Sequence, residues 1–457
     1  MSESSSERSK QQELETALAA LARVTFKQIE EHPEFELGAK EEYLTYRVQV
    51  TNLKYTDKGV DGFNSSSEPR IHTRPALMAA MRLLTEVEAQ PEYRAAVELL
   101  DGSAAKGSIG PTFVVQRFVH AVAVLSLPEA LDLSRTLAAE AFSLRKWRAT
   151  AFLVGVVPPI TALVISPHNT LRRVIADDLG YEAAAELLAY GRAAPGPWGK
   201  GTPSAILEVT LEAGRQTDIN AIVSRIEFAL RLLRRASVIE LRREMHTSSL
   251  LDSGSITWDY GGQTNPAYTA KLEPNDAGAI GRIAAILDGP SPHPEVATAL
   301  RIARGHFDAG LLKGGSPESM VASAVAGLEA LFSDSNQDLK RALSQRVTLA
   351  LALLGAVPAD LHSGLREAYD IRSRFSHGST QKLPPDRISG AAALTLDCLR
   401  AALLMFHQLP ASLDRDAFLR EIDLALLDPA KRDELRVTLR AQVFTAIPFA
   451  APPAAHG

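Results

Sequence analysis

The spacing of hydrophobic residues makes the second half of the chain a series of amphipathic helices. From residue 294 onward, apolar residues recur at intervals of three and four, which is the helical period. Ser316-Pro317-Glu318 is a typical helix start, and Gly378 is a natural left-handed helix end. The expected core includes Leu328, Leu331, Leu349, Leu353, Ile371, Phe375, Leu394 and Leu399. The predicted helices cover residues 295–312, 316–332, 337–354, 358–378, 386–408, 414–427 and 429–445.

The pattern before residue 294 is mixed, and we predict an α+β region there. Alternation of apolar and polar residues over 46–55 is typical of a half-buried strand, whereas the Gly-, Ser- and Asn-rich stretch 59–70 indicates a loop. Further strands are predicted at 150–157, 160–166, 205–211 and 256–260. Helices are predicted at 13–31, over 75–148 with an interruption near 101–111, at 170–190 and at 218–236.

A chain of 457 residues is expected to form two or three domains, and the patterns above suggest where their boundaries lie. Residues 191–203 are rich in Gly and Pro and poor in apolar residues, as linkers are. The predicted protein is mainly α. Its parts are a disordered N-terminus (1–12), an α+β domain of unknown role (13–190), the linker (191–203), a mixed connecting region (204–293), an all-α helical bundle (294–410), and C-terminal helices with a Pro/Ala tail (411–457).

Composition narrows the classes of partner. The net charge of −5 gives no overall basic footprint, so any RNA contact must be local and salt-sensitive. The single cysteine, Cys398, lies in an apolar run and is expected to fill core. The start of the chain has no apolar signal segment, and the apolar stretch 149–165 is broken by Gly155 and a Pro pair. We therefore expect a cytoplasmic protein without a membrane span.

One motif near the end of the fourth helix of this second half suggests chemistry: Arg372, four residues, then His377-Gly378. This spacing is not specific. Arg301 and His306 are also separated by four residues, and Arg400 and His407 by six. Those other pairs lie inside predicted helices with no glycine after the histidine. The Arg372–His377 motif is distinguished by a helix end and the polar loop that follows it.

The two residue types suit RNA cleavage by the neighbouring 2′-hydroxyl. Histidine titrates near neutral pH and can remove the hydroxyl proton. Arginine stays charged and binds phosphate oxygens with paired donors. This chemistry requires neither a metal nor another cofactor, and the sequence has no paired Cys/His spacing of a metal site. Five residues turn about 140° around a helix, so Arg372 and His377 converge only if the helix ends between them.

Together with Gly327-Leu328-Glu329-Ala330-Leu331-Phe332 and Arg346-Val347-Thr348-Leu349-Ala350, this motif resembles the Apea-like HEPN family, over roughly residues 222–410. The resemblance implies an endoribonuclease, with Arg372 and His377 as catalytic residues. It also implies a homodimer in which two motifs meet, acting in toxin or anti-phage defence, and the N-terminal half would then sense a phage or host trigger. Tyr369, Asp370, Ser373 and Arg374 are candidate helpers, and the family often has Asn, Asp or His where this chain has Ser373.

Two alternatives stay open, and a third is rejected. The motif could be structural, with Arg372 paired to Asp370 or Glu367 and His377 capping the helix; the protein would then be a non-catalytic scaffold that dimerises and binds a partner or ligand. The basic run 224–245 could bind RNA through Arg231, Arg234 and Arg235 on one helical stripe, or form a solvated face balanced by glutamates. The Gly-rich stretch at 196–202 fails the P-loop pattern, so nucleotide binding there is not expected.

Overall fold

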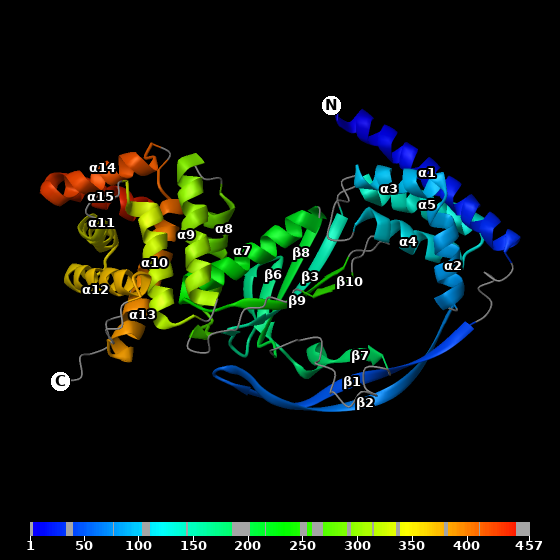
Figure 1. Ribbon diagram of the computed structural model, residues 1–457, viewed down its shortest axis with the longest axis horizontal. Helices are drawn as coiled ribbons and strands as arrows, with labels where there is room; N and C mark the ends of the chain where they lie inside the picture. Colours follow the sequence, from blue (N-terminus) through cyan, green and yellow to red (C-terminus); the bar gives the residue numbers. More distant parts are fainter. Residues whose placement is uncertain are drawn as a thin grey trace.

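The computed structural model is mostly helical, with sheet confined to the part before residue 294 (Figure 1). It describes residues 3–32, 40–75, 77–102, 110–142, 145–184, 202–214, 216–246, 254–257, 268–289, 294–312, 315–334, 339–378, 383–410 and 412–444. The predicted linker 191–203 and the tail after 444 lie largely outside these residues.

The first helices form a module with its own core, here called the N-terminal helical module. Leu14, Leu18 and Leu21 are fully buried in it, as their spacing predicted. The first helix begins at Glu3, so the prediction of a disordered segment over 1–12 was wrong. The module consists of α1 (Glu3–Glu31), α2 (Leu77–Glu88), α3 (Pro91–Asp101), α4 (Pro111–Val122) and α5 (Leu127–Phe142).

A long hairpin leaves the module between its first and second helices. Its strands, β1 (Lys40–Thr56) and β2 (Gly59–Pro75), pair antiparallel over nearly their whole length. The strand predicted at 46–55 is confirmed, but the loop predicted at 59–70 was wrong. The side chains of residues 63–70 are exposed, so backbone pairing with β1 holds this part of the strand, and its sequence shows no apolar alternation.

The central feature is a six-stranded sheet in the order β10-β9-β3-β8-β6-β5, with every pair antiparallel. It combines strands from both sides of residues 191–203, so this stretch does not separate two domains. Its strands are β3 (Arg145–Val154), β5 (Leu163–Ser166), β6 (Asn169–Arg173), β8 (Ala205–Gly214), β9 (Ile239–His246) and β10 (Gly254–Thr257).

The helix predicted at 170–190 was wrong. Residues 169–173 form β6, where Leu171 is fully buried opposite Leu207 of β8, so pairing in the sheet overrides the local helical spacing. A short 3₁₀ helix, η2 (Ala176–Leu179), and strand β7 (Tyr181–Ala184) follow, and β7 pairs with β1 of the hairpin. Residues 156–157 (β4) pair in parallel with β11 (Ala270–Lys271).

The helices after the sheet agree closely with the prediction. Helix α7 (Gln216–Arg234) packs on β3 and β8, and α8 (Asp276–Asp288), which the pattern missed, packs on α7. Of the expected core, Leu328, Leu331, Leu353, Ile371 and Leu399 are buried, whereas Phe375 is 48% exposed because it lies in the last turn of its helix. The helices are α9 (Pro294–Leu312), α10 (Pro317–Phe332), α11 (Leu339–Leu353), α12 (Pro358–Ser376), α13 (Pro385–His407), α14 (Arg415–Leu427) and α15 (Pro429–Gln442).

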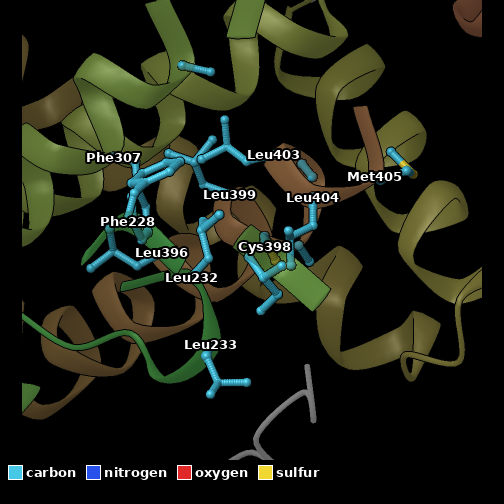
Figure 2. Packing of buried hydrophobic residues seen from close by; sticks show 14 of the residues in the cluster. Phe228, Leu232, Leu233, Phe307, Leu396, Cys398, Leu399, Leu403, Leu404 and Met405 are labelled. Carbon is cyan, nitrogen blue, oxygen red and sulfur yellow. The ribbon is translucent and has the colours of Figure 1, made fainter. Parts of the chain in front are cut away.

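One hydrophobic core joins the sheet to these helices, extending from Trp147 to Val443. Phe228 of α7 meets Phe307 of α9 edge to face, with ring centroids 6.2 Å apart, and Leu396 and Leu399 of α13 lie against them (Figure 2). Helix α13 is long and apolar enough to cross a membrane by length and composition alone, but 78% of its most apolar window is buried inside the protein. The helical region 294–410 therefore shares its core with the connecting region 204–293.

Candidate functional site

The predicted motif lies at the C-terminal end of α12. Leu361, Leu365, Ala368 and Ile371 are buried on one face of this helix and fix its orientation. His377 is the C-cap residue, and its N–H donates to the Ser373 carbonyl over 3.1 Å. Gly378 has a φ of +64°, so the predicted left-handed helix end is confirmed.

Arg372 is bound to the neighbouring helix α10. Its Nη2 donates to Glu329 Oε2 over 3.0 Å, and its guanidinium carbon lies 5.6 Å from the centre of the Tyr369 ring. The pairing with Asp370 or Glu367 that the structural alternative named was wrong. Asp370 instead pairs with Lys340 of α11 at 2.5 Å, and Glu367 pairs with Arg387 of α13 at 2.6 Å.

The electrostatics of this ion pair leave Arg372 with binding capacity. Burial raises the pKa of Glu329, and the charge of Arg372 partly offsets that effect. Glu329 Oε1 is buried and accepts no hydrogen bond from any described residue. The bond to Glu329 uses one of five N–H donors of the guanidinium, and the Arg372 side chain is 30% exposed. Other donors of Arg372 therefore remain for an oxyanion.

His377 is exposed, and a single chain does not join it to Arg372. No hydrogen bond links the two side chains within the residues that the structure describes. Arg372 faces α10, and the five-residue step to His377 turns about 140° around the helix. The helix ends between the two residues, at Ser376, which is the condition that the sequence analysis set for their convergence, but within one chain the two side chains still do not meet.

The candidate helpers have different surroundings. Tyr369 is half-buried beneath Arg372, and Asp370 is tied to Lys340. Ser373 is half-buried, and its carbonyl holds the helix end. Arg374 is half-exposed and lines a groove, so of the four it is the residue placed to meet a ligand.

This groove, here called the basic groove, has a volume of about 530 Å³ and lies between α11, α12 and α13. The sequence did not predict it, because its walls meet only in the tertiary structure: most lining residues belong to one face of α12, and the rest come from α11, α13 and the segment before α13. Its lining residues are Lys340, Ser363, Arg366, Glu367, Asp370, Arg374, Leu383 and Arg387.

The predicted RNA-binding stripe is not a free surface. Arg231 is buried, pairs with Glu227 and Asp308, and donates to the Val238 carbonyl. Arg234 binds both carboxylate oxygens of Asp276, at 2.7 and 2.9 Å. The run also does not stay helical, because residues 239–246 form β9.

The third member of that stripe, Arg235, belongs to an ion-pair network that joins α7 to α13. It pairs with Asp397 at 2.6 Å, and Asp397 also pairs with the buried Arg400 at 2.9 Å. Arg400 donates to the carbonyls of Leu232 and Leu233, which are the last turn of α7. All three arginines of the stripe, like Arg400, are therefore turned toward internal carboxylates.

The alternative motif pairs have structural surroundings. In the Arg400–His407 pair, the arginine is buried. Burial and the charge of the nearby Arg304 lower the pKa of the histidine to about 4. Burial also lowers the pKa of His306, which faces partly inward from α9. Of the three Arg…His pairs, only the one ending at His377 places its histidine fully at the surface.

The described residues contain no metal site, and the chain matches no known protein in the comparisons made. Within the described residues, no group of three or more His, Cys, Asp or Glu side chains is placed to hold a metal ion. Comparisons with protein-family models, with curated proteins and with solved structures found no match to this chain. The resemblance to the HEPN family therefore depends on the motif residues themselves.

Proposed function

We propose that this protein is a metal-independent endoribonuclease of the HEPN type that acts as a homodimer. The observation that supports it best is the end of α12, where Arg372 keeps spare donors and His377 is an exposed cap residue of the same helix. These are the two groups that cleavage by a 2′-hydroxyl needs.

In this reaction His377 removes the proton of the 2′-hydroxyl, whose oxygen then attacks the adjacent phosphorus. Arg372 stabilises the negative charge that develops on the phosphate oxygens. The bond from phosphorus to the 5′-oxygen breaks, that oxygen takes up a proton, and the other product carries a 2′,3′-cyclic phosphate. Histidine suits both proton transfers because it titrates near neutral pH.

A dimer supplies the convergence that one chain lacks. Arg372 faces α10 and His377 faces solvent, so a His377 from a second copy can approach the phosphate that Arg372 binds. Phe375, 48% exposed in the same last turn, gives such an interface an apolar contact. Symmetric dimers reuse one patch on both chains, which gives two equivalent pairs at one cleft.

The biological role that fits this activity is a toxin or anti-phage effector in the cytoplasm. The N-terminal helical module has its own core, separate from that of the motif-bearing helices. It is therefore suited to sense a phage or host trigger without disturbing the packing of the motif.

A specific observation also favours the second candidate, a non-catalytic scaffold. The Arg372–Glu329 ion pair ties α12 to α10, which is a structural task that needs no chemistry. On this proposal the same helices would form a dimer that binds a partner or ligand.

The test is incubation of the pure full-length protein with mixed RNA in EDTA. Cleavage with 2′,3′-cyclic phosphate or 3′-phosphate ends supports the nuclease. If RNA stays intact with EDTA and also with added divalent metal, the scaffold proposal replaces it. Cleavage that EDTA stops would place the active site elsewhere.

A further inference from the structure

We propose that the basic groove binds the phosphodiester backbone of an RNA strand and guides it to the end of α12. This inference rests on the proposed nuclease function and names the surface by which substrate is held. Among its described lining residues the groove has four cations, Lys340, Arg366, Arg374 and Arg387, and two carboxylates, Glu367 and Asp370.

The two carboxylates are already neutralised within the groove. Asp370 accepts from Lys340 at 2.5 Å, and Glu367 lies 2.6 Å from Arg387. This leaves Arg366 and Arg374 without an ion-pair partner among the described residues. Two arginines that share a groove and lack a counter-charge favour an anionic ligand.

The chemistry of the lining favours phosphate over an apolar ligand. Among the described residues that line the groove, Leu383 is the only one with an apolar side chain, and the others are charged or hydroxylic. Arginine binds phosphate oxygens through paired N–H donors, and it does so better than a point charge does.

The spacing of the free arginines favours a strand over a single phosphate. Arg366 and Arg374 lie eight residues apart on α12, which is about 12 Å along the helix axis and about 80° around it. The pair therefore spans a distance along α12 that a single phosphate does not fill, as contacts to separate phosphates of one polyanion would.

The groove also leads to the proposed base. His377 follows Arg374 by three residues, so it lies about 60° around the helix and about 4.5 Å further along the axis. Arg372, in contrast, faces Glu329 on α10. A strand held by Arg366 and Arg374 would pass from the groove to His377, where the second chain completes the site.

The experiment uses full-length protein and a labelled 2′-O-methyl RNA oligonucleotide, which has no free 2′-hydroxyl to attack. Its binding is measured by fluorescence anisotropy across a series of NaCl concentrations. Wild type is compared with Arg366→Ala/Arg374→Ala. The control is Arg301→Ala/Arg420→Ala, which removes two exposed arginines from α9 and α14 that also lack a described ion pair.

The groove variant should bind at least 10-fold more weakly at low salt, and the slope of log K against log salt should fall by about 1.4, because two phosphate contacts are lost at about 0.7 each. The control should change affinity less than twofold. Equal losses in both double variants, or none in the groove variant, would overturn the proposal. So would competition by a mononucleotide at the same concentration as the oligonucleotide, which would indicate a nucleotide pocket.

Activity measurements separate this proposal from the proposed function. If RNA is cleaved in EDTA, the groove variant should raise KM several-fold with kcat nearly unchanged, because it removes substrate binding but not chemistry. If the groove variant cleaves RNA with an unchanged KM, the groove proposal is wrong, and the nuclease proposal is unaffected. Loss of oligonucleotide binding in a protein that cleaves nothing would keep the groove and reject the nuclease.

Discussion

At the scale of single residues, Arg372 is the point where the catalytic and the structural proposals meet. It has a half-buried partner in Glu329 and spare donors toward solvent. Whether it serves packing, chemistry or both is decided by how stability and activity respond separately to its removal.

On the proposed mechanism, His377→Ala removes the base and Arg372→Ala removes a preorganised donor to the transition state. Each change should then lower RNA cleavage by about 10²–10³-fold. Arg372→Lys should also be poor, because a point charge does not reproduce paired donors. Single-turnover cleavage in EDTA measures the effect. Arg301→Ala and His306→Ala are the matched controls and should stay within a few-fold of wild type.

His377 is exposed, so His377→Ala should change the free energy of unfolding by less than about 0.5 kcal/mol. Retained cleavage in this variant, with normal folding, would move the active site away from α12.

The ion pair predicts a pH-dependent stability for Arg372→Ala. Burial already raises the pKa of Glu329, and removing Arg372 takes away the charge that lowers it. In the folded variant Glu329 then binds its proton more tightly than it does in the unfolded chain. The stability that this protonation contributes is fully present at acid pH and is lost as pH rises through the raised pKa of Glu329. The destabilisation relative to wild type, about 1–3 kcal/mol at pH 8, should be smaller at pH 5.

Urea unfolding of Arg372→Ala at pH 5 and pH 8 measures this difference. Arg372→Ala/Glu329→Gln should lose most of the pH dependence, since glutamine does not titrate. An equal destabilisation at both pH values would show that the charge of Glu329 is not what Arg372 compensates.

The sequence could identify the motif residues but not their partners. Arg372 and Glu329 lie 43 residues apart on different helices, so no local spacing joins them. For the same reason, the sequence did not predict the basic groove. It also suggested that Arg231 is a surface cation, whereas in the folded protein Arg231 pairs with the carboxylates of Glu227 and Asp308.

At the scale of elements, prediction succeeded where each helix has one apolar face and a clear end. Ser316 accepts from the Ser319 N–H at the start of α10, and Gly378 ends α12, as their residue types indicate. Prediction failed for β2, because its exposed side chains show no alternation of apolar and polar residues. It also failed for β6, because this short strand is stabilised by pairing with β8 and not by a pattern of its own.

Arg400 of α13 should be important for stability, because it holds the end of α7. It is buried, and it donates to Leu232, Leu233 and Asp397. Arg400→Ala removes one of the two cations that pair with the buried Asp397, and it takes the donor away from the carbonyls of Leu232 and Leu233, so it should destabilise the protein by about 3–5 kcal/mol. Arg301→Ala, an exposed change on α9, should cost less than about 0.5 kcal/mol in the same urea titration. Comparable losses would contradict the role of this network.

At the scale of the whole molecule, the proposed dimer can be tested by a crosslink. The native chain has one cysteine, Cys398, which is fully buried, and burial raises the pKa of its thiol. His377→Cys should therefore form a disulfide between two copies under mild oxidation if both His377 positions share one cleft. Arg301→Cys, exposed on α9, should not. Light scattering that finds a monomer at micromolar concentration, with or without RNA, would contradict the dimer.

The extent of the large core predicts which fragments fold. A fragment of residues 145–457 keeps every residue of that core and should unfold cooperatively on heating. A fragment of residues 294–457 loses Phe228 and Leu232, which pack on α9 and α13, and should show weak near-ultraviolet circular dichroism and bind a hydrophobic dye. Cooperative melting of the shorter fragment would show that the helices from α9 onward are an independent domain.

The hairpin has a consequence for how the N-terminal helical module can move. Its base adjoins α1 and α2, whereas near its tip the Tyr55 hydroxyl donates to the Ser204 carbonyl and Arg173 lies over the Tyr55 ring, at the sheet (Figure 1). The chain passing from α5 to β3 is a second attachment of the module to the sheet. A body attached at one point can turn in every direction, whereas a body attached at two can turn only about the line that joins them. Turning the module about that line therefore passes little torque to the sheet, whereas turning it about any other axis loads both attachments.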